Sequence, residues 1–321
     1  MPVGLAAVAA ALAQAAAPGP APDADALPLE RVYTVEATAQ AGATALEPSG
    51  LALCDGRLLM VSDDHADWVF ELRLRNEVTD GEVGRAEAEP YADLSSAPLP
   101  PRRGWTDWLR HLAGPDWEGI DCDAGALWLA SEAANAVLKV ELPSSFTWHF
   151  PELQAAVRAE GLLQTRNAGL EGLGYDARSR TGAPRWLLAA ERQPRGLIAI
   201  DSDTAMRAVV PPASGILPEG LVDDYTGIAH WRGRWFALER NARRVCELTE
   251  QLATRECRSF GDTLEAQAWA YTTGEPYGLA EGLAMDDRAV WVVVDNNGQP
   301  RAGDEADRRP LLFRFANTFV Q

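Results

Sequence analysis

The sequence predicts an all-β fold, namely a single β-propeller of five blades, each a four-stranded antiparallel sheet; six blades are the alternative. Three observations lead to this prediction. A small or acidic residue followed by Gly and an aliphatic residue opens a short apolar segment five times. Successive openings are 69, 53, 55 and 55 residues apart, and a period of about 50 is typical of propellers and other repeat arrays. An acid ends the next apolar segment in each repeat. The openings begin at Ser49, Glu118, Glu171, Thr226 and Glu281.

Each opening segment is predicted to be the first strand of a hairpin, because a polar turn and a second apolar run of strand length follow it. The second strands are expected at residues 58–62, 127–131, 186–190, 235–238 and 290–294. Asp and Gly are common in the intervening turns, as tight reversals require. We therefore interpret four acids as turn residues and not as ligands: Asp55, Asp123, Asp176 and Asp286.

A third strand with alternating apolar and polar residues follows in each repeat, as expected of a half-buried strand. These strands are expected at residues 68–74, 136–142, 196–201, 244–248 and 311–315. The fourth, outermost strand is poorly marked. Residues 105–112, 151–162 and 263–271 do not fit the strand pattern and are expected to form short helices between blades.

The two ends of the chain together supply one more repeat length, so residues 31–37 are predicted to complete the last blade. The ring is then closed by N-terminal and C-terminal strands. A sixth blade would have to lie in the 69-residue first interval, which is too short for two four-stranded units.

Residues 1–26 are predicted to be a signal peptide followed by an Ala/Pro-rich linker, because an apolar, Ala-rich run precedes small residues suited to cleavage. The alternative is a disordered Ala/Pro tail. Residues 27–321 then form the propeller domain. No later stretch has the roughly 18 uninterrupted apolar residues that a membrane span requires. We expect a periplasmic or secreted protein without a membrane span.

The net charge of −18 excludes nucleic acid as a partner, because phosphate backbones are bound by clustered Lys and Arg. We expect a monomer that binds a small anionic or ester substrate. The four cysteines fit an oxidising compartment. Cys246 and Cys257 flank a short polar connection and are expected to pair across a hairpin. Cys54 and Cys122 occupy equivalent strands of consecutive repeats, and whether they pair stays open.

The repeated acids are predicted to meet at one end of the ring. The first residue of a strand lies beside the last residue of its antiparallel partner, and first strands line the channel of a propeller. Carboxylates gathered in this way repel one another unless they are protonated, paired or bound to a metal. An oxygen-only ligand set favours a hard cation, most plausibly Ca²⁺. The predicted ligands are Asp63, Glu118, Glu132, Glu171, Glu191, Glu239, Glu281 and Asp295.

A purely structural ring of ion pairs is the alternative, because Glu191 is followed by Arg192 and Glu239 by Arg240. No G-x-S-x-G elbow, H-E-x-x-H motif or phosphate loop is present. The predicted catalytic residues are Glu171, Glu281 and His65, the one histidine expected near the acids. The residues predicted to bind substrate are Arg192, Arg240 and Asn296, with Arg195 and Arg243 behind the first two.

Several segments resemble the blade motifs of the phytase-like propeller family, often described as having esterase-like activity of phytase. They are residues 116–142, 167–176, 186–191, 225–241 and 277–297. SdiA-regulated propellers and gluconolactonase-like propellers have similar openings. The resemblance implies a secreted, Ca²⁺-dependent hydrolase of phosphoesters or other esters. Ser49 and Thr226 depart from the acidic opening, and the near absence of Lys argues against phytate itself. The alternatives are a non-catalytic binding propeller of the cell envelope and a lactone hydrolase.

Overall fold

The structure is a computed structural model, in which the described residues cover most of the chain after residue 24. The described residues are 25–39, 46–75, 83–100, 114–143, 145–165, 168–179, 185–202, 205–212, 217, 220–261, 263–264, 266, 268–272 and 278–320. The expected signal peptide and the expected helix at 105–112 therefore lie outside the described residues, apart from Asp25 and Ala26.

Strands are the main regular structure of the described chain, and its sheets divide into four-stranded units. Unit 1 comprises β2 (Pro48–Cys54), β3 (Arg57–Ser62), β4 (Trp68–Arg75) and β5 (Val83–Asp93). Unit 2 comprises β6 (Trp117–Asp123), β7 (Ala126–Ser131), β8 (Ala136–Glu141) and β9 (Ser145–His149). Unit 3 comprises β10 (Leu170–Tyr175), β11 (Trp186–Ala190), β12 (Gly196–Ser202) and β13 (Ala205–Val209). Unit 4 comprises β14 (Gly227–Trp231), β15 (Arg234–Glu239), β16 (Arg244–Leu248) and β17 (Thr254–Ser259). Unit 5 comprises β18 (Ala280–Met285), β19 (Ala289–Val294), β20 (Leu311–Ala316) and β1 (Leu29–Ala37).

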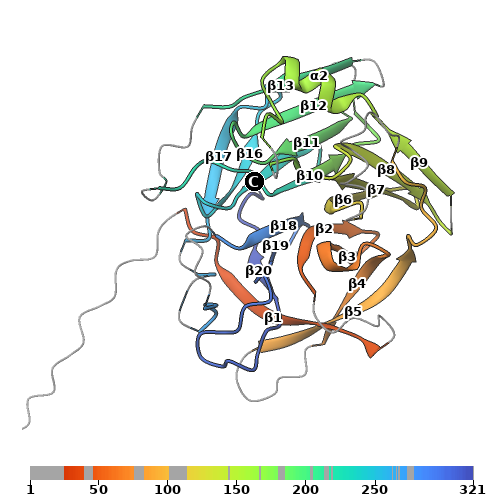
Figure 1. The fold of residues 1–321 in the computed structure, drawn as a ribbon. Coiled ribbons are helices and arrows are strands. Elements are labelled where there is room, and N and C mark those ends of the chain that lie inside the picture. The colour runs from red at the N-terminus through yellow and green to blue at the C-terminus, as the bar shows by residue number, and fades with distance from the viewer. Residues whose placement is uncertain are drawn as a thin grey trace, which may run out of the picture.

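The first strands of the five units contact one another in a closed order: β2, β6, β10, β14, β18 and again β2. The glycine of each opening motif makes this approach possible, because a side chain there would collide with the next strand. A Cβ on Gly119 would lie 2.7 Å from the Leu173 nitrogen, and one on Gly282 would lie 2.9 Å from the Leu51 nitrogen. Figure 1 shows β18, β2, β6 and β10 meeting near the centre, with β5, β9, β13 and β17 at the periphery. The fold is therefore all-β and propeller-like.

The N-terminal strand joins the C-terminal strands as expected, because β1 pairs antiparallel with β20, with Val32 opposite Phe313. The same strand also pairs in parallel with β5, where Val32 lies opposite Val83. This second pairing was not expected, and it merges units 1 and 5 into one eight-stranded sheet. An outermost strand carries unpaired amides and carbonyls along its free edge, so two such edges stabilise one another when they meet.

Two disulfides cross-link the sheets. Cys246 and Cys257 lie opposite each other on β16 and β17, which confirms the expected pairing across a hairpin. Cys54 and Cys122 also pair, and they connect β2 with β6, the first strands of two neighbouring units.

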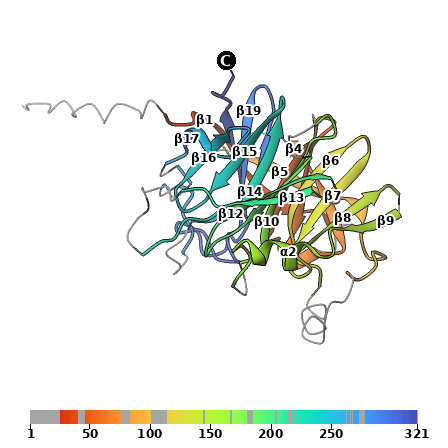
Figure 2. The same cartoon turned by 90° about the horizontal axis from the view of Figure 1, so that it is seen from above.

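Large apolar side chains fill the spaces between the units. Trp128, Trp235 and Trp291, which recur on the second strands, are all buried. One expected helix is present: α2 (Leu153–Ala159), which lies beside unit 3 (Figure 2). Its Leu153 and Val157 pack onto the apolar cluster that β10, β11 and β12 share. The described residues of 263–271 form turns and no helix, so that expectation was wrong for them. Within the described ranges, no helix is long and apolar enough to span a membrane.

Candidate cation and ligand site

A cavity of about 620 Å³ lies at the end of the ring where the first strands begin. Side chains from several units and from one loop form its wall. They include the opening residues of four units and the residues that directly follow four second strands. The lining residues are Pro48, Ser49, Asp63, Glu118, Glu171, Glu191, Arg192, Gln193, Gly220, Leu221, Val222, Arg240, Asn241, Glu281, Asp295 and Asn297.

A β-bulge places each opening acid. The pairing of β6 with β7 shifts register between Trp117 and Gly119, which leaves Glu118 as the extra residue. The same shift occurs at Glu171, at Glu281 and at Ser49. A bulge bends its strand and re-aims the extra side chain, and bulges are common beside functional sites. The fifth opening has no such shift, and the Thr226 hydroxyl donates to the carbonyl of Ala280 at 2.7 Å. Thr226 therefore does not line the cavity.

Glu118 belongs to two overlapping groups of carboxylates. Oxygens of Asp63, Asp116 and Glu118 lie within 4.8 Å of one another, and so do oxygens of Glu118, Glu132 and Glu171. Oε1 of Glu132 also accepts from the Gly169 amide at 3.0 Å. Among the described residues, no arginine, lysine or histidine forms an ion pair with Asp63, Glu118 or Glu171. We call Asp63, Asp116, Glu118, Glu132 and Glu171 the carboxylate cluster.

The pKa values of this cluster reflect its environment. Burial raises the pKa of Glu118 well above its usual range, and the charges of Glu171 and Asp63 raise it further. Burial and then the charge of Glu132 raise the pKa of Glu171 in the same way. The Asp63 side chain reaches solvent. Its pKa nevertheless rises to about 8, because protein surrounds the carboxyl group and other acids lie close to it. Without a cation these carboxyls therefore hold protons that ordinary acids have lost at neutral pH.

The opposite side of the cavity is neutralised by one guanidinium. Arg240 donates from Nε to Asp224 at 2.8 Å, from Nη2 to Glu191 at 2.8 Å and from Nη1 to Glu281. Arg192 also pairs with Glu191, and its side chain remains 33% exposed. The alternative of structural ion pairs thus describes this half of the cavity.

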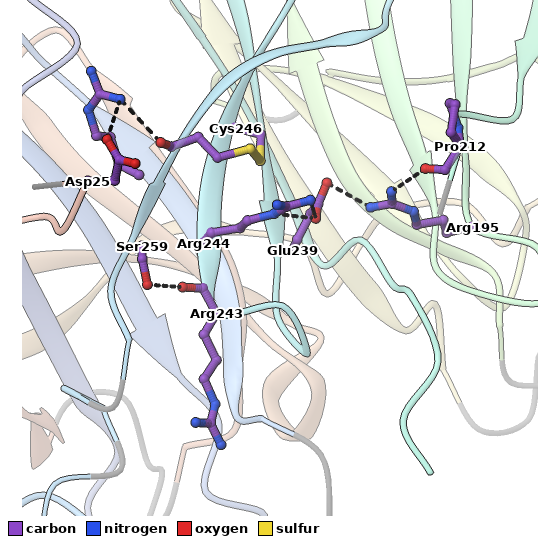
Figure 3. Close-up of a disulfide and its surroundings, with 10 residues drawn as sticks. Asp25, Arg195, Pro212, Glu239, Arg243, Arg244, Cys246 and Ser259 are labelled. Atoms are coloured by element: carbon purple, nitrogen blue, oxygen red, sulfur yellow. Dashed lines mark hydrogen bonds and ion pairs between the residues drawn. A yellow bond between two sulfur atoms is a disulfide. The ribbon is translucent and has the colours of Figure 1, made fainter. Parts of the chain in front are cut away.

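Some predicted site residues lie elsewhere. Glu239 is buried outside the cavity wall, where Nη1 of Arg195 and Nη2 of Arg244 each approach it at 2.7 Å (Figure 3). Arg195 is itself buried and donates to the carbonyl of Pro212 at 2.9 Å. It is therefore held away from the cavity.

Asn296 is fully buried, and its amide donates to the carbonyls of Gln299 and Arg308. The next residue, Asn297, lines the cavity in its place. His65 ends a short 3-10 helix (Asp63–His65) and faces the edge of Phe70, so it is not among the lining residues. The geometry thus gives neither Asn296 nor His65 access to the cavity.

The sequence analysis missed two acids at the site: Asp116 in the carboxylate cluster and Asp224 beside Arg240. Each stands two residues before an opening residue, at Glu118 and Thr226. An acid two residues before an opening residue was the sequence signal that could have identified them. It occurs in three of the five repeats, at Glu47, Asp116 and Asp224, so the same signal would also have selected Glu47, which is not among the residues that line the cavity.

Comparison with known proteins gives one family match: the SdiA-regulated family matches residues 113–297. No curated protein matches the sequence. Solved structures with a similar arrangement include a glutaminyl cyclase from Myxococcus xanthus, 13% identical over 89% of this chain and 94% of that chain, with a TM-score of 0.48. A virginiamycin B lyase from Staphylococcus aureus is 12% identical over 84% of this chain and 66% of that chain, with a TM-score of 0.41. A PQQ-bound aldose sugar dehydrogenase from Streptomyces coelicolor is 14% identical over 91% of this chain and 100% of that chain, with a TM-score of 0.40. At these scores none of the three structures carries an argument about activity.

Proposed function

The chain belongs to the SdiA-regulated family, and from that premise we propose that it is a Ca²⁺-dependent propeller that hydrolyses a small phosphoester or another ester in its acidic cavity. The observation that carries the proposal is the place of Glu118 in two groups of carboxylates at once, with no basic partner among the described residues. Of the two resemblances drawn from the motifs, the SdiA-regulated one is confirmed. The phytase-like one stays a prediction.

We interpret the five units as the blades of a single propeller. The closed order of contacts among β2, β6, β10, β14 and β18 supports this interpretation, and β1 completes the last blade through its pairing with β20. Two disulfides support an oxidising compartment, as expected of a periplasmic or secreted protein.

The carboxylate cluster fits a hard divalent cation. Ca²⁺ takes about 6 to 8 oxygen ligands in loose geometry, and this cluster offers carboxylate oxygens alone. Its five members are Asp63, Asp116, Glu118, Glu132 and Glu171. When bound, Ca²⁺ would supply a Lewis acid that polarises an acyl or phosphoryl oxygen.

The chain's own residues supply binding and proton transfer. Arg192 is partly exposed beside the cavity and offers N–H donors to an anionic substrate. Glu281 is the base that accepts a proton from the attacking water, because the charge of Arg240 opposes the rise in its pKa that burial causes. Leu221 and Val222 form an apolar part of the wall, against which the carbon portion of a substrate packs.

A non-catalytic binding propeller is the second candidate. It is favoured by the three carboxylates that occupy Arg240, because a guanidinium so engaged has little capacity left for a substrate. In that case the cavity binds a cation and a ligand without turning the ligand over.

A panel of phosphomonoesters, aryl esters and lactones, tested with Ca²⁺ and with a chelator, distinguishes the two candidates. We expect turnover that the chelator abolishes and that Glu171→Gln reduces, while the exposed Glu141→Gln control is unaffected. Tight Ca²⁺ binding without turnover on any substrate would establish the binding protein. Turnover insensitive to both chelator and Glu171→Gln would contradict the proposed site.

A further inference from the structure

A second cavity, of about 770 Å³, opens at the opposite ends of the first strands. It is lined by the last residues of β6, β10 and β14 and by the turns that follow them. None of its lining residues belongs to the acidic cavity described above. The two cavities are therefore separate sites.

An aliphatic layer lies between the two cavities along the first strands. Its members stand one residue after each opening glycine and are only 1–4% exposed. They are Leu51, Ile120, Leu173, Ile228 and Leu283. A small ligand in one cavity is thus separated from the other by packed side chains.

A histidine and an aspartate face each other in the second cavity. Nε2 of His230 lies 3.6 Å from Oδ2 of Asp176, too far for a hydrogen bond between them. Nε2 is buried, and it has no hydrogen-bond partner among the described residues. Burial lowers the pKa of His230, so the ring is neutral near pH 7. In the tautomer that carries its proton on Nδ1, the Nε2 atom can accept a hydrogen bond. Two acceptors at this separation can both be reached by one nitrogen that carries several N–H groups.

The charges around this pair favour a cation. Five acids and four arginines line the cavity, and three of the arginines are already paired: Arg234 and Arg255 bind Glu247 at 2.8 and 3.0 Å, and Arg232 binds Asp287 at 2.6 Å. Asp176 also lines the cavity. Among the described residues, His230 is the one basic side chain within ion-pair distance of it. Asp123 adds a further carboxyl group to the same wall, whereas the oxygens of Asp121 already accept from the amides of Cys122 and Tyr175 at 2.8 and 2.6 Å.

Aromatic rings form the apolar part of the wall. Trp235 lies 4.5 Å from the His230 ring, measured between centroids, and Tyr175 lines the same cavity. Aromatic faces attract cations and also pack against carbon chains. The wall thus combines hydrogen-bond acceptors, negative charge and aromatic surface.

We propose that this second cavity binds a small primary amine in its ammonium form, which donates N–H groups to Asp176 Oδ2 and His230 Nε2 and packs its carbon portion on Tyr175 and Trp235. The proposal is independent of the function proposed for the acidic cavity. It identifies the ligand by chemistry alone: a cation with at least two N–H donors and an apolar body.

Calorimetric titration of the full chain with benzylammonium tests the proposal, with tetramethylammonium as the comparison. We expect saturable binding of benzylammonium with a dissociation constant below about 1 mM, and affinity for tetramethylammonium at least about tenfold weaker, since that cation has no N–H to donate. Equal affinities would show that hydrogen bonds do not select the ligand. Absence of saturable benzylammonium binding would overturn the proposal outright. Neither comparison depends on a variant that has to fold.

A variant then locates the binding. Asp176→Asn keeps the acceptor for the Arg178 amide in the turn but removes the charge, and we expect it to weaken benzylammonium binding about tenfold. Asp55→Asn, at the equivalent turn of unit 1, is the matched control and should bind as the parent does. Saturating Ca²⁺ and Glu171→Gln should also leave amine binding unchanged. Loss of amine binding on addition of Ca²⁺ would place the amine in the acidic cavity and contradict the proposal.

Discussion

Arg240 donates from Nη2 to Oε1 of Glu191 at 2.8 Å, so a cation that follows β15 is paired with an acid that follows β11 in the neighbouring unit. The same guanidinium binds Asp224 and Glu281. One buried cation thus compensates two buried acids, Glu191 and Asp224, and the half-buried Glu281, whereas Glu118 forms no ion pair with a described basic residue. The cavity is divided into an ion-paired half and an acidic half.

Replacing this cation should be strongly destabilising. Arg240→Gln removes the cation paired with Glu191, Asp224 and Glu281 and leaves the buried Asp224 without an ion pair among the described residues. Removing one partner of a buried ion pair costs about 3 to 5 kcal/mol. Urea denaturation measures the loss. The exposed pair of Arg57 with Glu71 supplies the control, because Arg57→Gln should change stability by less than about 1 kcal/mol. Equal effects of the two substitutions would mean that Arg240 is not the centre of a buried network.

Glu118→Gln should weaken Ca²⁺ binding more than Asp295→Asn does. Glu118 contributes to both carboxylate groups, whereas Asp295 belongs to neither. We expect a loss of affinity of about tenfold or more for Glu118→Gln, measured by calorimetric titration. Melting without Ca²⁺ should change less than Ca²⁺ affinity does, because burial and the neighbouring acids raise the pKa of Glu118 and so favour its neutral form, which glutamine resembles. Unchanged Ca²⁺ affinity would remove Glu118 from the ligand set.

Stability without metal should fall as the pH rises. Folding raises the pKa of Asp63 to about 8 and that of Asp295 to about 7, mainly through burial. The folded chain therefore holds more protons than the unfolded chain above about pH 4. Stability is then fully present below the unfolded pKa values and is lost as the pH rises through the folded ones. Calorimetric melting between pH 4 and 9 in chelator should show this decline.

Adding Ca²⁺ should reverse that dependence. A cation binds the ionised carboxylates, so its stabilising effect should be larger at pH 8 than at pH 5. Mg²⁺ serves as the control ion, because it is smaller and demands stricter octahedral geometry. A melting temperature that Ca²⁺ does not change at any pH would show that the cluster does not bind the ion.

The two disulfides should contribute unequally. Cys54 and Cys122 are separated by 68 residues and Cys246 and Cys257 by 11. In the loop-entropy model the first bond is worth about 4 kcal/mol and the second about 3 kcal/mol. We expect the Cys54→Ser/Cys122→Ser double variant to lose more stability than the Cys246→Ser/Cys257→Ser one, measured in urea. The reverse order would show that strain or unfolded-state structure outweighs loop closure.

The close approach of the first strands can be tested at one glycine. Gly119→Ala places a methyl group 2.7 Å from a backbone nitrogen and 2.9 Å from a backbone carbon of unit 3, neither of which can move independently of its strand. We expect a loss of about 1 to 3 kcal/mol. Gly303→Ala is the matched control, since a Cβ there meets no atom within 4 Å. Tolerance of Gly119→Ala would mean that the inner strands separate easily.

Periodicity in the sequence predicted much of this arrangement. The recurring glycine openings identified the five first strands, and the acids near them identified six lining residues of the cavity. Local patterns could not reveal what depends on contacts between units. The sequence predicted that Arg240 binds substrate, because its three acidic partners come from distant parts of the chain and could not be recognised. Asn296 and Asn297 are adjacent and chemically identical, so sequence alone could not show which of them faces the cavity.

The dual pairing of β1 has a consequence for how the chain reaches its final form during synthesis. β1 leaves the ribosome long before β20, so its antiparallel partner is absent for most of translation. β5 emerges much earlier and presents the parallel pairing that holds β1 at Val32 and Val35. The nascent chain can therefore protect an aggregation-prone edge at once, and the last strand then docks onto a template that is already in place.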